Sequence, residues 1–114
     1  MDKLLALVFA AAFFASPAFA APRAQSAEEC GIAADMALVA QSLAREEIQP
    51  SKARSIMARI YDVADSERGK ALMGEILDAA YRNGRESTPK FAEELFTACM
   101  KSGGNMDTVL GQRS

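Results

Sequence analysis

The chain has 114 residues, with 13 Lys and Arg against 15 Asp and Glu, a net charge of −2, and no histidine. This balance offers no basic excess for binding a nucleic acid or an anionic membrane surface. The lack of histidine removes the commonest general base and the commonest metal ligand.

Residues 1–20 have the three parts of a secretory signal peptide. Lys3 gives a positive start, an apolar run of 12 residues covers 4–15, and Ala18 and Ala20 are the small residues of a cleavage site. A membrane anchor is the alternative, but a spanning helix needs about 20 apolar residues. We therefore predict cleavage after Ala20, a periplasmic or secreted protein, and no stable membrane insertion of the mature chain.

The rest of the chain is expected to form one helical domain over 26–111, between a flexible tail at 21–25 and a short tail at 112–114. Apolar residues recur at helical spacing, and no alternating run is long enough to predict a strand. Short connections favour antiparallel neighbours. The predicted fold class is all-α, a small antiparallel bundle of four helices.

Four helix starts are predicted from side chains that can accept a hydrogen bond from the first turn. Glu29 completes a capping box, Pro50 separates the first two helices, and Pro89 suits the first turn of the last. The expected N-caps are Ser26, Ser51, Ser66 and Thr88. The expected ends are near Glu47, near Asp65, at 83–84 and at 103–104, with a docked turn at 106–110 after them.

The buried faces are expected to follow the large apolar residues at positions i, i+3, i+4 and i+7. In the first helix a row of alanines widens that face, so a neighbouring helix can approach closely. The residues expected in the core are Ile32, Met36, Val39 and Leu43 in the first helix, Ala53, Ile56, Met57, Ile60, Tyr61 and Ala64 in the second, Leu72, Met73, Ile76 and Ala80 in the third, and Phe91, Ala92, Leu95, Phe96 and Cys99 in the fourth.

Cys30 and Cys99 are the only cysteines. In an oxidising compartment, two such residues predict one intramolecular disulfide. In a bundle that alternates in direction, the start of the first helix and the end of the fourth lie at the same end. The predicted disulfide therefore staples these two helices, and closing a loop of about 70 residues stabilises the fold by about 4 kcal/mol.

The sequence matches two known catalytic or phosphate-binding motifs, and both matches are incomplete. Residues 87–90 match S-x-x-K, the nucleophile motif of penicillin-binding enzymes, but the companion motifs are absent and helix capping explains the residues. Gly69 and Lys70 resemble the end of a phosphate loop without its first glycine or preceding strand. We predict no catalytic residue, no metal site and no cofactor.

Partner contacts are expected at three residues near the ends of the helices. Met100 and Met106 lie near the predicted disulfide, where methionine can offer an adaptable apolar surface. Tyr81 lies off the apolar centre of its helix, with a hydroxyl able to reach water. The expected partner is another exported or envelope protein.

These observations favour a non-enzymatic protein-binding module of the adaptor or inhibitor type. A carrier of a small apolar ligand is a further alternative, but the alanine-rich first helix predicts tight packing instead. The organisation also resembles that of small periplasmic acid-stress chaperones, which are exported, helical and held by one disulfide. That resemblance is one of architecture and implies an acid- or stress-activated chaperone. Without histidine, any acid switch has to act through carboxylates, below about pH 5.

Overall fold

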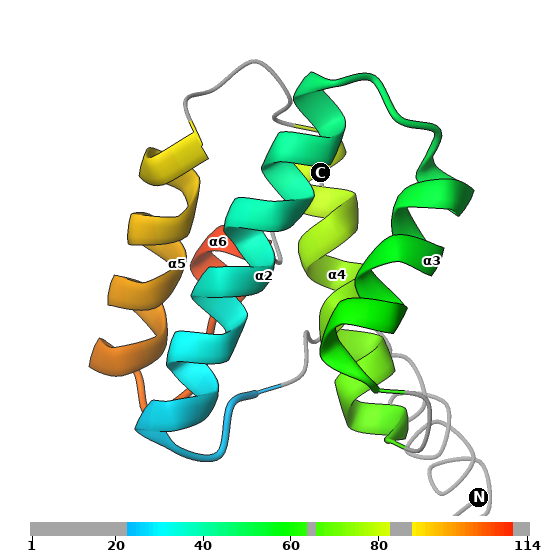
Figure 1. Ribbon diagram of the computed structural model, residues 1–114. Helices are drawn as coiled ribbons and strands as arrows, with labels where there is room; N and C mark the ends of the chain where they lie inside the picture. The colour runs from blue at the N-terminus through cyan, green and yellow to red at the C-terminus, as the bar shows by residue number, and fades with distance from the viewer. Residues whose placement is uncertain (1–22, 64–65, 83–87, 111–114) are drawn as a thin grey trace, which may run out of the picture.

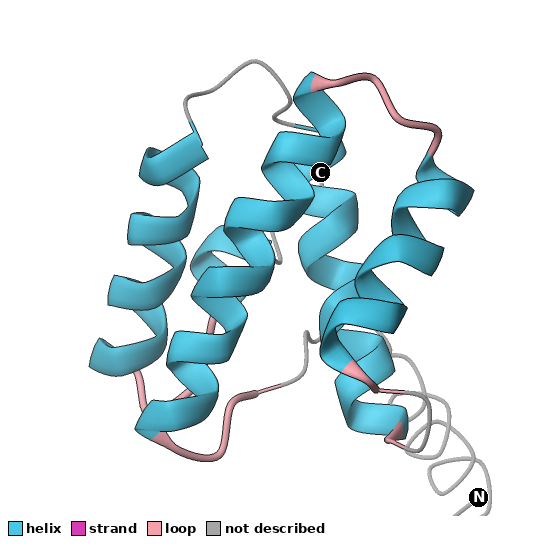
Figure 2. Ribbon diagram, in the orientation of Figure 1, coloured by secondary structure: helices cyan, strands magenta, loops and turns pink. Residues whose placement is uncertain are grey.

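The computed structural model describes residues 23–63, 66–82 and 88–110, and all the regular structure in these ranges is helical (Figure 2). The helices are α2 (Ala27–Arg45), α3 (Pro50–Tyr61), α4 (Glu67–Arg82), α5 (Thr88–Lys101) and the short α6 (Asp107–Leu110). The predicted all-α class is therefore confirmed. The signal peptide over 1–20, its cleavage point, the 112–114 tail, and residues Ala64, Asn83 and Gly84 lie outside the described residues.

The four long helices alternate in direction, and α2 occupies the centre of the bundle (Figure 1). It packs against α5, α4 and α3, while α3 also packs against α4. The docked turn predicted at 106–110 is α6, which contacts both α5 and α4. Consequently α4 and α5 flank α2, and α6 joins them behind it (Figure 1).

Serine caps begin two of the helices as predicted. The Ser26 hydroxyl accepts a hydrogen bond from the Glu29 amide at 3.2 Å, and the Ser66 hydroxyl accepts one from the Gly69 amide at 2.9 Å. Glu29 reaches back past the cap to accept from the Gln25 amide at 2.8 Å. This bond fixes the position of Gln25, the residue immediately before the Ser26 cap.

The connection between α2 and α3 differs from the prediction. Glu47 adopts a left-handed backbone with φ of 61°, and the amides of Glu47 and Ile48 bond back to Ala44 and Leu43. This Schellman motif ends α2 before the proline is reached. Pro50 is then the first residue of α3, where its missing N–H costs nothing, and Gln49 precedes it. The expectation that Ser51 caps this helix is therefore wrong.

The buried face of α2 contains the alanine row, as predicted: Ala33, Ala37 and Ala40 are completely buried. Of the larger residues expected there, Met36 is buried, and Val39 and Leu43 are partly buried against the core. Ile32 is 41% exposed, so its expected burial is wrong. The expected stripe of α4 is correct, since all of its members are buried: Leu72, Met73, Ile76 and Ala80.

The segment expected to be a loose tail is docked at residues 23–25. The Ala24 amide donates to the Gly104 carbonyl at 2.9 Å, and Ala24 is buried. Gly104 has φ of 96°, and a Cβ there would lie 2.0 Å from the Ala24 oxygen. Both the positive φ and the close approach of Ala24 require glycine at this position. The turn predicted at 103–104 therefore also forms the surface against which residues 23–25 dock, called here their seat.

Candidate functional site

The Cys30–Cys99 disulfide joins the start of α2 to the end of α5, as predicted. The two Cα atoms lie 5.7 Å apart, and both cysteines are buried. Because α2 and α5 also pack along their lengths, the bridge fixes one end of a pair of helices that already lie side by side.

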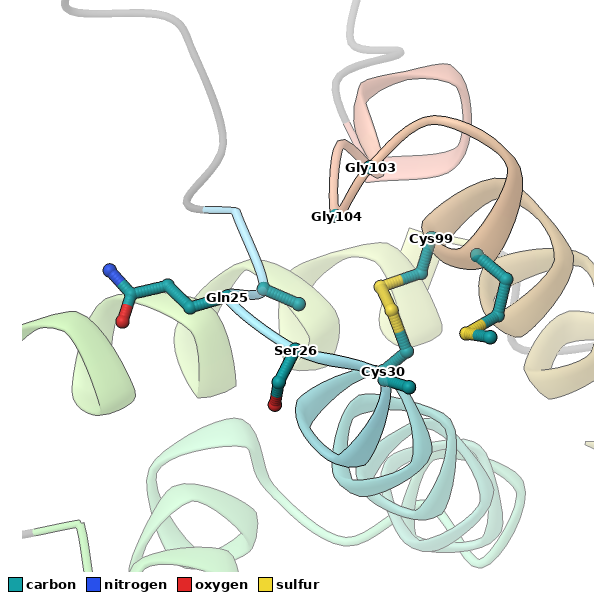
Figure 3. Close-up of a pocket in the computed structure, with 9 residues that line it drawn as sticks. Gln25, Ser26, Cys30, Cys99, Gly103 and Gly104 are labelled. Atoms are coloured by element: carbon teal, nitrogen blue, oxygen red, sulfur yellow. A yellow bond between two sulfur atoms is a disulfide. The ribbon is translucent and has the colours of Figure 1, made fainter.

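A surface hollow of about 480 Å³ opens beside this disulfide (Figure 3). Gln25 and Ser26 line it on the α2 side, while Gly103 and Gly104 line it on the α5 side. Met100 also contributes to its wall. The volume falls in the range of small-molecule and side-chain pockets, and its walls carry few charged groups.

An ionic network holds the segment that lines this hollow. Both carboxylate oxygens of Glu29 accept from the Arg68 guanidinium at 2.8 Å, and Arg68 also donates to the Arg23 carbonyl at 3.2 Å. The hydrogen bonds from Arg68 and from the Gln25 amide lower the pKa of Glu29 from 4.5 to about 2. The network therefore links 23–25, α2 and α4 while Glu29 is ionised.

Four large apolar side chains are exposed on α2 and α5. Three of them are Leu38 at 39%, Phe96 at 40% and Met100 at 47%, and the fourth is Ile32. Phe96 and Met100 lie one turn apart on α5, so they share a face. Ala98, which borders α6, lies about 160° from Phe96 around the helix, so the exposed pair is turned away from α6.

Leu38 belongs to the same side of the helix pair. Around α2 it lies about 80° from Cys30 and 100° from Ala37, both of which are buried. Cys30 faces α5 through the disulfide, and Asp35, on the far side of Leu38, borders α3 through Tyr61. Leu38 therefore points to solvent beside α5. We call Leu38, Phe96 and Met100 the α2–α5 face.

A second exposed pair lies on the other side of α2. Ile32 is 41% exposed and Ile60 of α3 is 53% exposed. Next to Ile60, the Tyr61 hydroxyl donates to the Asp35 carboxylate at 2.6 Å. Burial, together with this bond, raises the pKa of Tyr61. The bond fastens α3 to α2 beside these two exposed side chains.

Of the three predicted contact residues, Met100 is exposed as expected. Met106 is completely buried because α6 folds its apolar side onto α5 and α4, so the expectation of an exposed patch there is wrong. Tyr81 is half-buried, and its hydroxyl donates to the Ile48 carbonyl. That bond gives it a structural role between α4 and the α2–α3 connection.

Phe96 was expected in the core, and Leu38 was not singled out. The helical positions of these two residues could have indicated their exposure. Leu38 lies off the apolar stripe of its helix, and Phe96 lies at the edge of the apolar arc centred on Leu95. Ile60 was likewise expected to be buried, but α3 turns it outward.

The two weak motifs found in the sequence, at 69–70 and at 87–90, form no catalytic or binding site among the described residues. Gly69 lies in the first turn of α4 against Ser66, where a helix cap accounts for it. Ser87 lies outside the described residues, and Lys90 is exposed. Within 23–63, 66–82 and 88–110, no group of three His, Cys, Asp or Glu residues could hold a metal ion, and no helix is long and apolar enough to cross a membrane.

Comparison with known proteins gives no relative: no family model, curated protein or solved structure matches the chain.

Proposed function

We propose that this protein is exported and acts as a non-enzymatic protein-binding module. The observation that carries the proposal is the α2–α5 face, where three large apolar side chains remain exposed on two helices joined by a disulfide. Apolar patches on a rigid support are typical of protein-interaction sites, because binding then orders few groups.

Export is supported by the signal-like residues 1–20 and by the disulfide, which oxidising compartments favour. The test is the intact mass of the protein recovered from the periplasmic fraction of an expressing cell. Cleavage after Ala20 gives one expected mass, with two fewer hydrogens for the disulfide. Recovery of an uncleaved chain from the cytoplasm would overturn this part of the proposal.

Protein binding is tested by replacing Met100 with a photo-crosslinking amino acid and irradiating cells that export the protein. A discrete adduct is expected at this position. Lys52, exposed on α3, is the control position and should give no such adduct. Equal or absent labelling at the two positions would contradict the proposal.

An acid-activated chaperone is the second candidate, favoured by the Glu29–Arg68 network beside the hollow. Protonation of Glu29 would weaken its bonds with Arg68 and the Gln25 amide, and its pKa of about 2 confines this event to strongly acidic solution. The test is suppression of aggregation of a model client across pH 2–4. A protein that leaves client aggregation unchanged throughout that range is not such a chaperone.

A further inference from the structure

We propose that the α2–α5 face binds a basic amphipathic helix of another protein. This inference rests on the proposed binding function and specifies its partner. The length of the face, the charges around it and the area it offers all favour such a partner.

The length of the face suits about two turns of a partner helix. Leu38 and Cys30 are eight residues apart on α2, which corresponds to a rise of about 12 Å. The hollow beside the disulfide continues the face past Met100, which lines both. A partner helix laid along this line would contact Leu38 with one apolar side chain and place another, seven or eight residues away, in the hollow.

The charges bordering the face are acidic. Glu93 is exposed on α5, one turn before Phe96, and Asp35 is exposed on α2, one turn before Leu38, where its carboxylate also accepts from Tyr61. On α5, Lys90 and Lys101 lie more than 100° around the helix from Phe96. Arg45 lies on the same side of α2 as Leu38, but two turns beyond it at the far end of the helix. An acidic border around apolar residues favours lysines and arginines flanking the apolar stripe of the partner.

The area available is too small for a stable pair of identical chains. Three side chains exposed by 39–47% offer on the order of 250 Å², whereas a stable interface buries about 800 Å² on each partner. A second copy would also bring acidic borders together, and an anionic membrane would be repelled by them. A single helix with basic flanks satisfies both the area and the charge.

The probe for the test is a synthetic amphipathic helix of Leu and Lys, with Leu at i, i+3, i+4 and i+7. A peptide with Glu in place of every Lys is its control. Fluorescence anisotropy with the oxidised mature protein is expected to show saturable one-to-one binding of the Lys peptide. Binding of the Glu peptide is expected to be at least tenfold weaker. Equal affinity for the two peptides would overturn the proposal.

Two neighbouring residues provide a matched pair for charge. Glu93→Lys is expected to raise the Kd of the Lys peptide about fivefold. Glu94→Lys makes the same change in net charge, but Glu94 lies about 160° from Phe96 around the helix and is expected to change the Kd less than twofold. Equal effects of the two variants would mean general electrostatic attraction and would overturn the proposed site.

The apolar contacts have a matched pair as well. Phe96→Ser and Leu38→Ser are each expected to raise the Kd about tenfold, while Ile60→Ser, on the α3 side, leaves it unchanged. Circular dichroism and the retained disulfide verify folding of each variant. If the Lys peptide does not bind although crosslinking at Met100 still captures a protein, the helix proposal fails while the binding function stands. If neither peptide binding nor crosslinking at Met100 is observed, both the helix proposal and the proposed binding function fail.

Discussion

Glu47 occupies a backbone region that costs a residue with a Cβ about 1 kcal/mol or more. Glycine has no such penalty but gains freedom in the unfolded chain. We therefore expect Glu47→Gly to raise the free energy of unfolding by about 0.5 kcal/mol. Urea denaturation measures the change. Glu46→Gly removes the same charge at φ of −80° and should give no gain, so a similar gain in both variants would contradict this explanation.

Glu29 makes stability depend on pH in a defined window. Its folded pKa of about 2 lies below its ordinary 4.5, so the stabilisation is complete above pH 4.5 and is lost as the pH falls toward 2. Glu29→Gln should lower the melting temperature by several degrees at pH 7 and flatten its dependence between these values. The exposed neighbour Glu28→Gln is the control, and an unchanged pH profile in Glu29→Gln would disprove the assignment.

At the scale of elements, two glycines should respond oppositely to alanine. Gly104→Ala places a Cβ 2.0 Å from the Ala24 oxygen at a positive φ, and we expect a loss of about 2 kcal/mol or more. Gly31 lies within α2 with open space around it, so Gly31→Ala should gain about 0.5–1 kcal/mol. Thermal unfolding distinguishes these outcomes. A tolerated Gly104→Ala would mean that the seat for residues 23–25 is not rigid.

The helices themselves could largely be predicted from sequence, because their caps and long apolar periods are local signals. Ser26 and Ser66 cap as expected, and the stripe of α4 is correct. The buried side of α2 was also predicted in large part, since Met36 and the alanines lie in the core. The exposure of Ile32 could not be predicted, because it shares the helical period of its buried neighbours and depends on where the adjacent helices lie.

The candidate site was predictable in part. The disulfide followed from the cysteine count and the helix directions, and Met100 from its place near the disulfide. The burial of Met106 agrees with the docked turn predicted at 106–110, so expecting an exposed methionine there was the error. Phe96 falls within an apolar arc wider than the surface that α2 covers, so its exposure depends on where α2 lies.

At the scale of the whole molecule, the disulfide is a large contribution to stability. Its 69-residue separation implies about 4 kcal/mol, out of roughly 5–15 kcal/mol for a domain. The Cys30→Ser/Cys99→Ser variant should therefore unfold at a much lower urea concentration than the oxidised protein. Reductant should leave that variant unchanged. Equal midpoints for the variant and the oxidised protein would show that the bridge adds little.

The position of α6 also determines when, during synthesis, the core of the protein can be completed. Met106 and Leu110 are completely buried against helices that precede them, and the bridge to Cys30 needs Cys99. During synthesis the core is therefore complete only when residue 110 has emerged. The disulfide cannot form before Cys99 has emerged, so the covalent bond and the last part of the core are both added late.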